Sequence, residues 1–144
     1  MKHITEFQNG EFLLTTDPRK LDQQAVFTLL KQTYWADHRA EEITLRAIEN
    51  SLCFSLFQKD RQIGLIRLVT DYATYAYLCD VIISQEARHA GLGSWCLRCV
   101  LEHPDLQGLR RWSLATKDAQ AFYEKFGFHS LEHPERYMEI FNDC

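Results

Sequence analysis

The chain has 144 residues, of which 46% are hydrophobic and 12% aromatic, and its formal net charge at pH 7 is −4. This length suits a single domain with an ordinary hydrophobic core, and the composition excludes a disordered chain. The acidic balance argues against a generally basic nucleic-acid-binding protein. We therefore expect one domain over residues 1–144, with no nucleic acid among its partners.

The sequence also bears on the compartment. No apolar run approaches the roughly 20 residues that span a bilayer, and the stretch from Met1 to Glu6 lacks the apolar core of a signal peptide. The five cysteines are odd in number and lie mostly in apolar segments, which is typical of reduced core thiols. These features predict a soluble, cytoplasmic protein without a membrane partner.

The first half of the chain alternates between helical and strand-like patterns. The predicted elements are a strand at 12–16, a helix capped by Asp22, a helix at 40–50, and strands at 52–59, 62–70 and 76–83. The short connection Asp60-Arg61 predicts an antiparallel hairpin between the strands at 52–59 and 62–70.

The second half continues with helices and short strands. The predicted elements are a helix from near Gly91 to about 102, a strand at 111–115, a helix at 118–126 ended by Gly127, and closing strands at 128–131 and 137–141. This order predicts an α+β fold, a three-layer α/β sandwich with a mixed central sheet and helices on both faces.

The segment from Val81 to Ser94 joins an apolar strand, a glycine-bearing turn and the start of an amphipathic helix. The first backbone N–H groups of a helix lack partners and, together with the helix dipole, attract anions. Gly91 and Gly93 let a ligand approach the backbone, and Arg88 adds positive charge. We therefore predict a phosphate-binding turn made of Arg88, His89, Ala90, Gly91, Leu92, Gly93 and Ser94.

Two motifs carry a resemblance to a known family. The stretch Arg88-His89-Ala90-Gly91-Leu92-Gly93 matches every fixed position of the acetyl-CoA signature of the GCN5-related N-acetyltransferase (GNAT) superfamily: Arg or Gln, two residues, Gly, one residue, Gly or Ala. The stretch Ala119 to Phe128 resembles the superfamily's late helix with its Tyr-x-x-x-Gly-Phe ending. With the order of elements, the resemblance covers about residues 10 to 141.

This resemblance implies acetyl-CoA as co-substrate, held between the splayed strands 78–83 and 111–115. The pantetheine arm would contact the backbone of Val81, Ile82 and Ile83, and the pyrophosphate would bind the turn at 88–94. Many members have an asparagine that contacts this arm seven residues before the helix tyrosine, where this chain has Thr116. A hydroxyl can also form such a hydrogen bond.

The resemblance also implies direct attack of the acceptor amine on the thioester in a ternary complex, with no metal. The pattern His129-x-x-Glu132-His133 is shared with a class of zinc peptidases, but that class needs both histidines on one helical turn. Here the pattern lies in a predicted strand and loop before Pro134, which excludes that geometry. A homodimer is common among similar proteins.

Two residues are candidates for catalysis. By its position in the motif, Tyr123 is implied to be the general acid, because a phenol of pKa about 10 can protonate a thiolate whose conjugate acid has a pKa of about 8.5. The alternative is that Tyr123 only packs and anchors the cofactor sulfur.

Asp80 is the charged exception in an apolar strand, where burial is expected to raise its pKa, and it is a candidate general base or holder of a relay water. The alternative is that Asp80 serves only as a structural hydrogen-bond partner.

Three residues between the first two helices are candidates for the acceptor site. Tyr34, Trp35 and Arg39 lie where members of the superfamily commonly build that site, and Arg39 would suit a carboxylate on the substrate. The alternatives are that the aromatic pair closes the edge of the core, and that Arg39 is a solvated side chain paired with Glu41 or Glu42.

We interpret the chain as an N-acetyltransferase that moves an acetyl group from acetyl-CoA to a primary amine. The expected acceptor is a small amine or an amino-acid-like metabolite. Two other functions stay open, namely a non-catalytic acyl-CoA-binding or regulatory module and an enzyme that acetylates a protein or peptide.

Overall fold

The computed structural model describes residues 3–143, without the side chains of His89 and Ala90. These residues form one six-stranded sheet in the order β1-β2-β3-β4-β5-β6. The strands are β1 (Glu6–Asn9), β2 (Phe12–Thr15), β3 (Leu52–Gln58), β4 (Arg61–Thr70), β5 (Tyr75–Ile83) and β6 (Arg111–Leu114). Neighbouring strands are antiparallel except for β5 and β6, which are parallel, so the predicted mixed sheet is confirmed.

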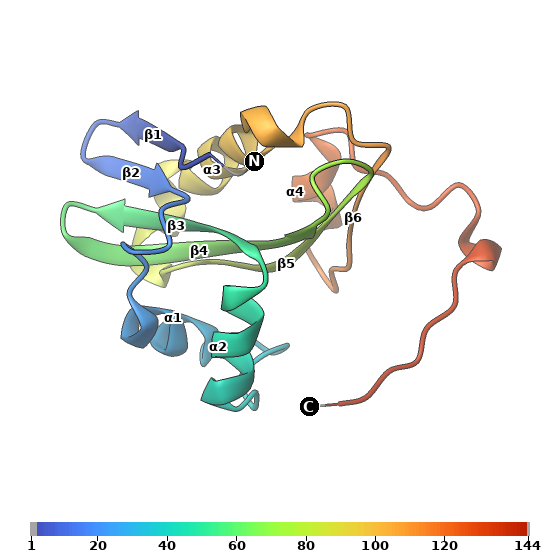
Figure 1. Ribbon diagram of the computed structural model, residues 1–144, viewed down its shortest axis with the longest axis horizontal. Helices are drawn as coiled ribbons and strands as arrows, with labels where there is room; N and C mark the ends of the chain where they lie inside the picture. Colours follow the sequence, from blue (N-terminus) through green and yellow to red (C-terminus); the bar gives the residue numbers. More distant parts are fainter. Residues whose placement is uncertain (1–2, 144) are drawn as a thin grey trace.

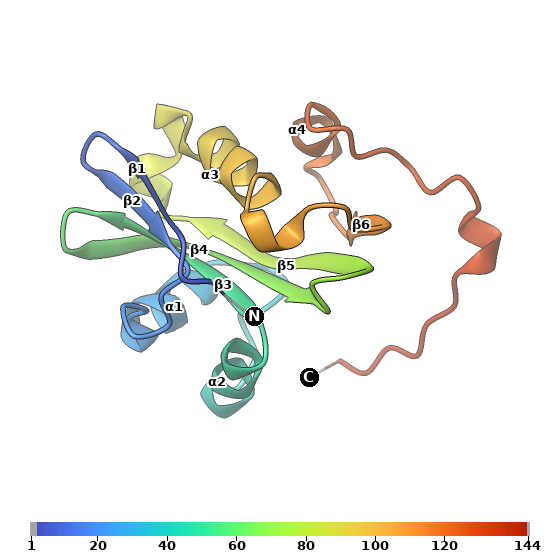
Figure 2. The same ribbon diagram turned by 45° about the horizontal axis from the view of Figure 1, so that its top comes forward.

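Helices cover both faces of this sheet (Figures 1 and 2). The α-helices are α1 (Gln23–Leu30), α2 (Glu41–Glu49), α3 (Leu92–Leu101) and α4 (Gln120–Glu124), and the 3-10 helices are η1 (Gln85–Ala90), η2 (Pro104–Leu106) and η3 (Pro134–Arg136). Helices α1 and α2 lie on one face, and α3 lies on the other with α4 beside it. The three-layer sandwich is thus confirmed. Across residues 3–143, no helix has both the length and the apolar character needed to cross a bilayer.

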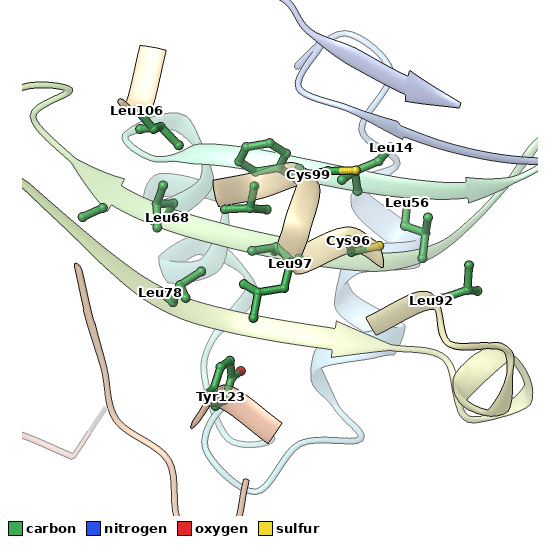
Figure 3. Close-up of a cluster of buried hydrophobic side chains, with 14 of the residues drawn as sticks. Leu14, Leu56, Leu68, Leu78, Leu92, Cys96, Leu97, Cys99, Leu106 and Tyr123 are labelled. Atoms are coloured by element: carbon green, nitrogen blue, oxygen red, sulfur yellow. The ribbon is translucent and has the colours of Figure 1, made fainter. Parts of the chain in front are cut away.

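Each face of the sheet carries its own hydrophobic core. The larger core packs α3 against the sheet, and its fully buried members include Leu14, Leu68, Leu97 and Leu106 (Figure 3). The smaller core packs Val26, Leu29 and Leu30 of α1 against Leu65 and Ile82. Helix α1 begins where the sequence predicts it, because the Asp22 carboxylate accepts hydrogen bonds from the N–H groups of Gln24 and Ala25.

The two ends of the chain differ from the sequence prediction. Strand β1 was not predicted, because the segment Glu6–Asn9 has one apolar residue, and it exists through its antiparallel pairing with β2. The predicted closing strands at 128–131 and 137–141 are wrong. After Gly127, at φ +98°, the chain runs away from the sheet as an exposed segment, in which Met138 is 98% and Ile140 92% exposed (Figure 1). An alternating pattern makes a strand only where a neighbouring edge accepts its hydrogen bonds.

A one-residue register shift between β4 and β5 prepares the site. Leu68 pairs with Leu78 but Ile66 pairs with Val81, so that two residues of β5, Cys79 and Asp80, lie opposite the single residue Arg67. Such a bulge reverses which face the following side chains occupy. Leu78 accordingly packs in the core beneath α3, whereas Ile82, four residues later, packs in the core beneath α1.

The histidine at the end of α3 is a buried polar residue. His103 is 0% exposed, and its Nδ1 accepts a hydrogen bond from the Asp105 N–H at 3.0 Å. Among the described residues, its Nε2 is the one fully buried side-chain nitrogen or oxygen without a hydrogen-bond partner. Burial lowers the pKa of His103 below the ordinary value of 6.5, with a smaller opposing effect of Asp105.

We predict that this histidine makes the fold acid-sensitive. Because its pKa is lower in the folded than in the unfolded state, its contribution to stability is complete above pH 6.5 and is lost as the pH falls below that value. Urea unfolding at about pH 7.5 and about pH 5.5 should show this decrease in the wild type. The variant His103→Asn keeps a capping acceptor but cannot titrate, so its decrease should be smaller. The same decrease in both proteins would contradict the assignment.

Candidate active site

Strands β5 and β6 pair over only part of their length. Their parallel pairing runs from Tyr75 and Arg111 to Leu78 and Leu114, after which β6 ends and β5 continues to Ile83. Within residues 3–143, the edge of β5 beyond Leu78 therefore has no strand beside it, which confirms the expected splayed pair.

The open edge of β5 exposes backbone amides. Peptide groups alternate between the two edges of a strand, and the Ser84 N–H donates to the Ile63 carbonyl on β4 at 2.7 Å. The peptide groups of Val81 and Ile83 are thus directed to the opposite, open edge. The Arg88 Nε donates to the Ile83 carbonyl at 2.9 Å, which leaves the two N–H groups as donors at this edge.

The predicted phosphate-binding turn lies between the end of β5 and the start of α3. Gly91 adopts the left-handed conformation, at φ +69°, and is the N-cap of α3, so the intrahelical hydrogen bonds begin with the Trp95 N–H donating to the Gly91 carbonyl. The N–H groups of Leu92, Gly93 and Ser94 precede this bond and have no intrahelical acceptor. The side chain of Leu92 is buried in the core, so this residue offers its backbone only.

Two predicted members of this turn are described in part. The backbone of His89 and Ala90 belongs to η1, but the roles predicted for their side chains lie outside the described residues. The exposed Arg88 bridges from η1 to the end of β5 through its bond to Ile83, and so holds positive charge at the mouth of the open edge.

A cavity of about 750 Å³ lies against this edge. It brings together ten of the predicted site residues, namely Tyr34, Trp35, Arg39, Asp80, Val81, Ile82, Ile83, Arg88, Thr116 and Tyr123. Further polar side chains that were not predicted as site residues also line the cavity, among them Arg67, Tyr77, Lys117 and Asp118. Arg67 could have been found, because it interrupts the apolar stretch Ile63–Val69 as Asp80 interrupts its own strand.

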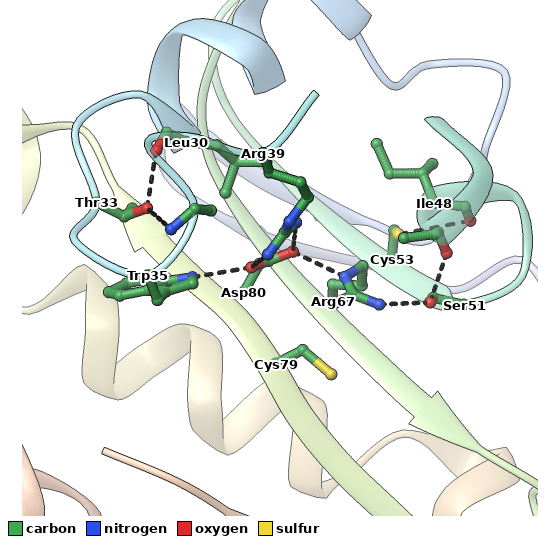
Figure 4. Close-up of polar contacts among 12 residues, drawn as sticks. Leu30, Thr33, Trp35, Arg39, Ile48, Ser51, Cys53, Arg67, Cys79 and Asp80 are labelled. Carbon is green, nitrogen blue, oxygen red and sulfur yellow. Dashed lines mark hydrogen bonds and ion pairs between the residues drawn. The ribbon is translucent and has the colours of Figure 1, made fainter. Parts of the chain in front are cut away.

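Asp80 is at the centre of a charged cluster (Figure 4). Arg39 donates two hydrogen bonds to its carboxylate, at 3.0 and 3.1 Å, and the Arg67 Nε donates a third at 2.8 Å. The indole N–H of Trp35 donates a fourth at 2.9 Å. The Arg67 Nη1 also donates to the Ser51 hydroxyl at 3.1 Å. The carboxylate of Asp80 is 1% exposed and accepts bonds from both β4 and the loop before α2.

This cluster overturns two predictions. Burial acts to raise the pKa of Asp80, but the hydrogen bonds and charges of Arg39 and Arg67 outweigh burial, so the pKa lies below its ordinary value of 3.8. The expected raised pKa is therefore wrong. The interpretation of Arg39 as a solvated partner of Glu41 or Glu42 is also wrong, because its side chain is 14% exposed and pairs with Asp80.

The aromatic pair before α2 lies at the cavity wall. Tyr34 and Trp35 form an edge-to-face pair with ring centroids 5.1 Å apart, and they are 54% and 40% exposed. The Tyr34 hydroxyl accepts a hydrogen bond from the Lys117 N–H at 3.2 Å, and the Lys117 Nζ lies 5.4 Å from the centre of the Tyr34 ring. These residues do not close the core. They connect the loop before α2 with the loop after β6 across the cavity.

Tyr123 presents a nearly buried phenol to the cavity. It is 9% exposed, and its ring meets Phe122 and Phe128 edge-to-face. Burial raises the pKa of Tyr123 above the ordinary value of 10.0, and the neighbouring Tyr34 adds to the effect. Within residues 3–143, no protein group hydrogen-bonds its hydroxyl. The phenol therefore keeps its proton across the neutral pH range.

Thr116 contributes to the start of α4. Its Oγ1 accepts a hydrogen bond from the Ala119 N–H at 3.1 Å. The hydroxyl hydrogen is left to donate to an acceptor in the cavity. In the part of the chain that the structure describes, His, Cys, Asp and Glu side chains form no group of three or more that could hold a metal ion.

Comparison with known proteins gives a consistent result. The model of the acetyltransferase (GNAT) family matches residues 23–128. A candidate acetyltransferase of Gibberella zeae is 32% identical over 151 residues, covering 87% of this chain and 84% of that protein.

Solved structures agree with this. The crystal structure of a candidate GNAT acetyltransferase from Xanthomonas campestris pv. campestris is similar with a TM-score of 0.87 and 39% identity, covering 99% of this chain and 96% of that one. A GNAT family protein of Streptococcus pneumoniae shares the fold, with a TM-score of 0.71 and 22% identity over 97% and 98% of the two chains. The chain therefore belongs to the GNAT family of acetyltransferases.

Proposed function

We propose that this acetyltransferase moves the acetyl group of acetyl-CoA to the primary amine of a small or amino-acid-like acceptor. The observation that carries the proposal is the cavity in which the open edge of β5, the cationic turn at Arg88 and the protonated phenol of Tyr123 meet. Its volume of about 750 Å³ lies in the range of small-molecule sites.

The residues present fit coenzyme A. The N–H groups of Val81 and Ile83 at the open edge match the amide-bearing pantetheine arm, and the hydroxyl of Thr116 offers it a further donor. The N–H groups at the start of α3 and the guanidinium of Arg88 match the pyrophosphate. The donor site thus combines an open strand edge with a helix N-terminus.

Acetyl transfer makes three demands on the protein. A backbone N–H of Val81 or Ile83 would donate to the thioester oxygen as negative charge grows there. A C–N bond forms between the neutral amine and the carbonyl carbon, and the C–S bond breaks. Tyr123 would give its proton to the departing sulfur, and the proton of the amine passes to water.

Asp80 is better suited to positioning than to accepting this proton. Its two oxygens already accept four hydrogen bonds, and its pKa lies below the ordinary value. A general base near neutral pH needs a higher pKa and a free lone pair. We assign to Asp80 the role of holding Trp35, Arg39 and Arg67 at the cavity wall.

The general-acid role predicts a large effect of Tyr123→Phe. The variant keeps the ring but lacks the proton, so kcat should fall about 10²- to 10⁴-fold with little change in the KM for acetyl-CoA. Because burial raises the pKa of Tyr123 above 10.0, the wild-type rate should not show loss of this proton below that pH. The rate at which free coenzyme A thiol is released with a panel of amines measures both kcat and its pH dependence.

The control for this experiment is Tyr137→Phe, a tyrosine outside the cavity lining that should keep the wild-type rate. If Tyr123→Phe has wild-type kcat at every pH, the phenol is not the acid. If the wild type binds acetyl-CoA but releases no thiol with any amine, the protein is a binding module and not an enzyme.

The donor site predicts a selective effect of Arg88→Glu. Reversing the charge beside the turn should raise the KM for acetyl-CoA by about tenfold or more, and the KM for the acceptor much less. Steady-state kinetics with each substrate varied in turn separate the two constants. Arg98→Glu, an exposed position on α3 outside the cavity lining, is the matched control. Equal acetyl-CoA affinity in wild type and Arg88→Glu would remove Arg88 from the pyrophosphate site.

A further inference from the structure

The charged cluster at the cavity wall is not electrically balanced. Two guanidinium groups share the single carboxylate of Asp80. The side chains of Arg39 and Arg67 are only 14% and 13% exposed, so bulk water screens their charge poorly. The cluster therefore holds one positive charge in excess beside the cavity.

No other buried group in the described residues cancels this charge. The thiols nearest Arg67 are neutral, because burial raises the pKa of Cys53 to about 12 and also raises that of Cys79. Burial likewise raises the pKa of Tyr77, which stays uncharged. The other charged or titratable side chains that line the cavity are Tyr34, Arg88, Lys117, Asp118 and Tyr123, with Glu139 of the C-terminal segment near Tyr77. Among those that line the cavity, Arg88 and Lys117 are cations and Asp118 is a carboxylate, so the excess charge of the cavity lining remains positive.

The two arginines also keep hydrogen-bond donors in reserve. Arg39 uses Nη1 and Nη2 on Asp80, and Arg67 uses Nε on Asp80 and Nη1 on Ser51. Within residues 3–143, Arg39 Nε and Arg67 Nη2 have no protein acceptor, and neither is fully buried. Both residues line the cavity, so these donors are available to a ligand inside it.

We propose that Arg39 and Arg67 bind a carboxylate of the acceptor, so that the acceptor is an amino carboxylate such as a free amino acid. This rests on the proposed N-acetyltransferase function. One carboxylate neutralises the single excess charge of the cluster formed by Arg39, Arg67 and Asp80. The same excess charge disfavours polyamines and other dications, since like charges in a poorly screened site repel.

A binding measurement tests the proposal without turnover. Calorimetry on the protein saturated with coenzyme A would compare amino acids with their carboxamides, for example glycine with glycinamide, β-alanine with its amide and γ-aminobutyrate with its amide. In at least one pair the acid should bind about tenfold or more tightly, because only the acid bears the charge that the arginines complement. With acetyl-CoA in its place, kcat/KM for that pair should show the same preference.

Variants of Arg39 assign the preference to the cluster. Arg39→Gln leaves Asp80 paired one-to-one with Arg67, so the excess charge disappears and the acid should lose its advantage over the amide. Arg39→Lys keeps the charge and should retain most of the preference, which also guards against a variant that fails to fold. Arg46→Gln, an exposed arginine on α2 outside the cavity lining, should behave as wild type.

The outcomes separate the two proposals. Equal binding of acid and amide in every wild-type pair, or no binding by either, overturns the carboxylate site, and acetylation of amines by acetyl-CoA would then still support the enzyme. A preference for the acid that survives in Arg39→Gln also overturns it. Selective binding of an acid that Arg39→Gln abolishes supports the carboxylate site, even if no amine is acetylated and the proposed enzymatic function fails.

Discussion

The buried carboxylate of Asp80 is the constraint on which the cavity depends. A charge that is 1% exposed is tolerated only when partners compensate its lost hydration, and here two arginines and an indole N–H do so. These partners come from β4 and from the loop before α2, so the ion cluster fixes that loop against the sheet. Removing one partner from such a cluster typically costs about 3–5 kcal/mol. The same charges that hold this loop against the sheet also give the cavity wall its polarity.

Strand β5 supplies both halves of the site through two irregularities. The register shift at Cys79 and Asp80 turns Asp80 towards α1 and α2 and directs the amides of Val81 and Ile83 to the outer edge. The early end of β6 leaves that edge without a partner. A regular strand in a fully paired sheet would have placed Asp80 in the core beneath α3 and consumed the amides in the sheet ladder. One stretch of backbone thus provides both the open edge and the buried carboxylate of the cavity.

The cavity places two different polar environments close together. On one side, burial keeps the phenol of Tyr123 protonated, and among residues 3–143 its hydroxyl has no hydrogen-bond partner. On the other side, Arg39 and Arg67 carry more charge than Asp80 cancels. In the proposed function, the residue that gives a proton and the residues that hold the substrate are therefore separate, and Asp80 acts through its arginine partners.

The sequence by itself determined the mixed sheet, the helices on both faces, the glycine turn before α3 and the helix that carries Tyr123, because apolar periodicity and the glycine motifs are local signals. It placed strands at 128–131 and 137–141 that do not form, and it missed β1, since pairing depends on which edges meet in space. The charge state of Asp80 and the part played by Arg67 were decided by the tertiary structure alone. Residues 39, 67 and 80 are far apart in the chain, and an ionisable group takes its pKa from the neighbours that folding brings to it.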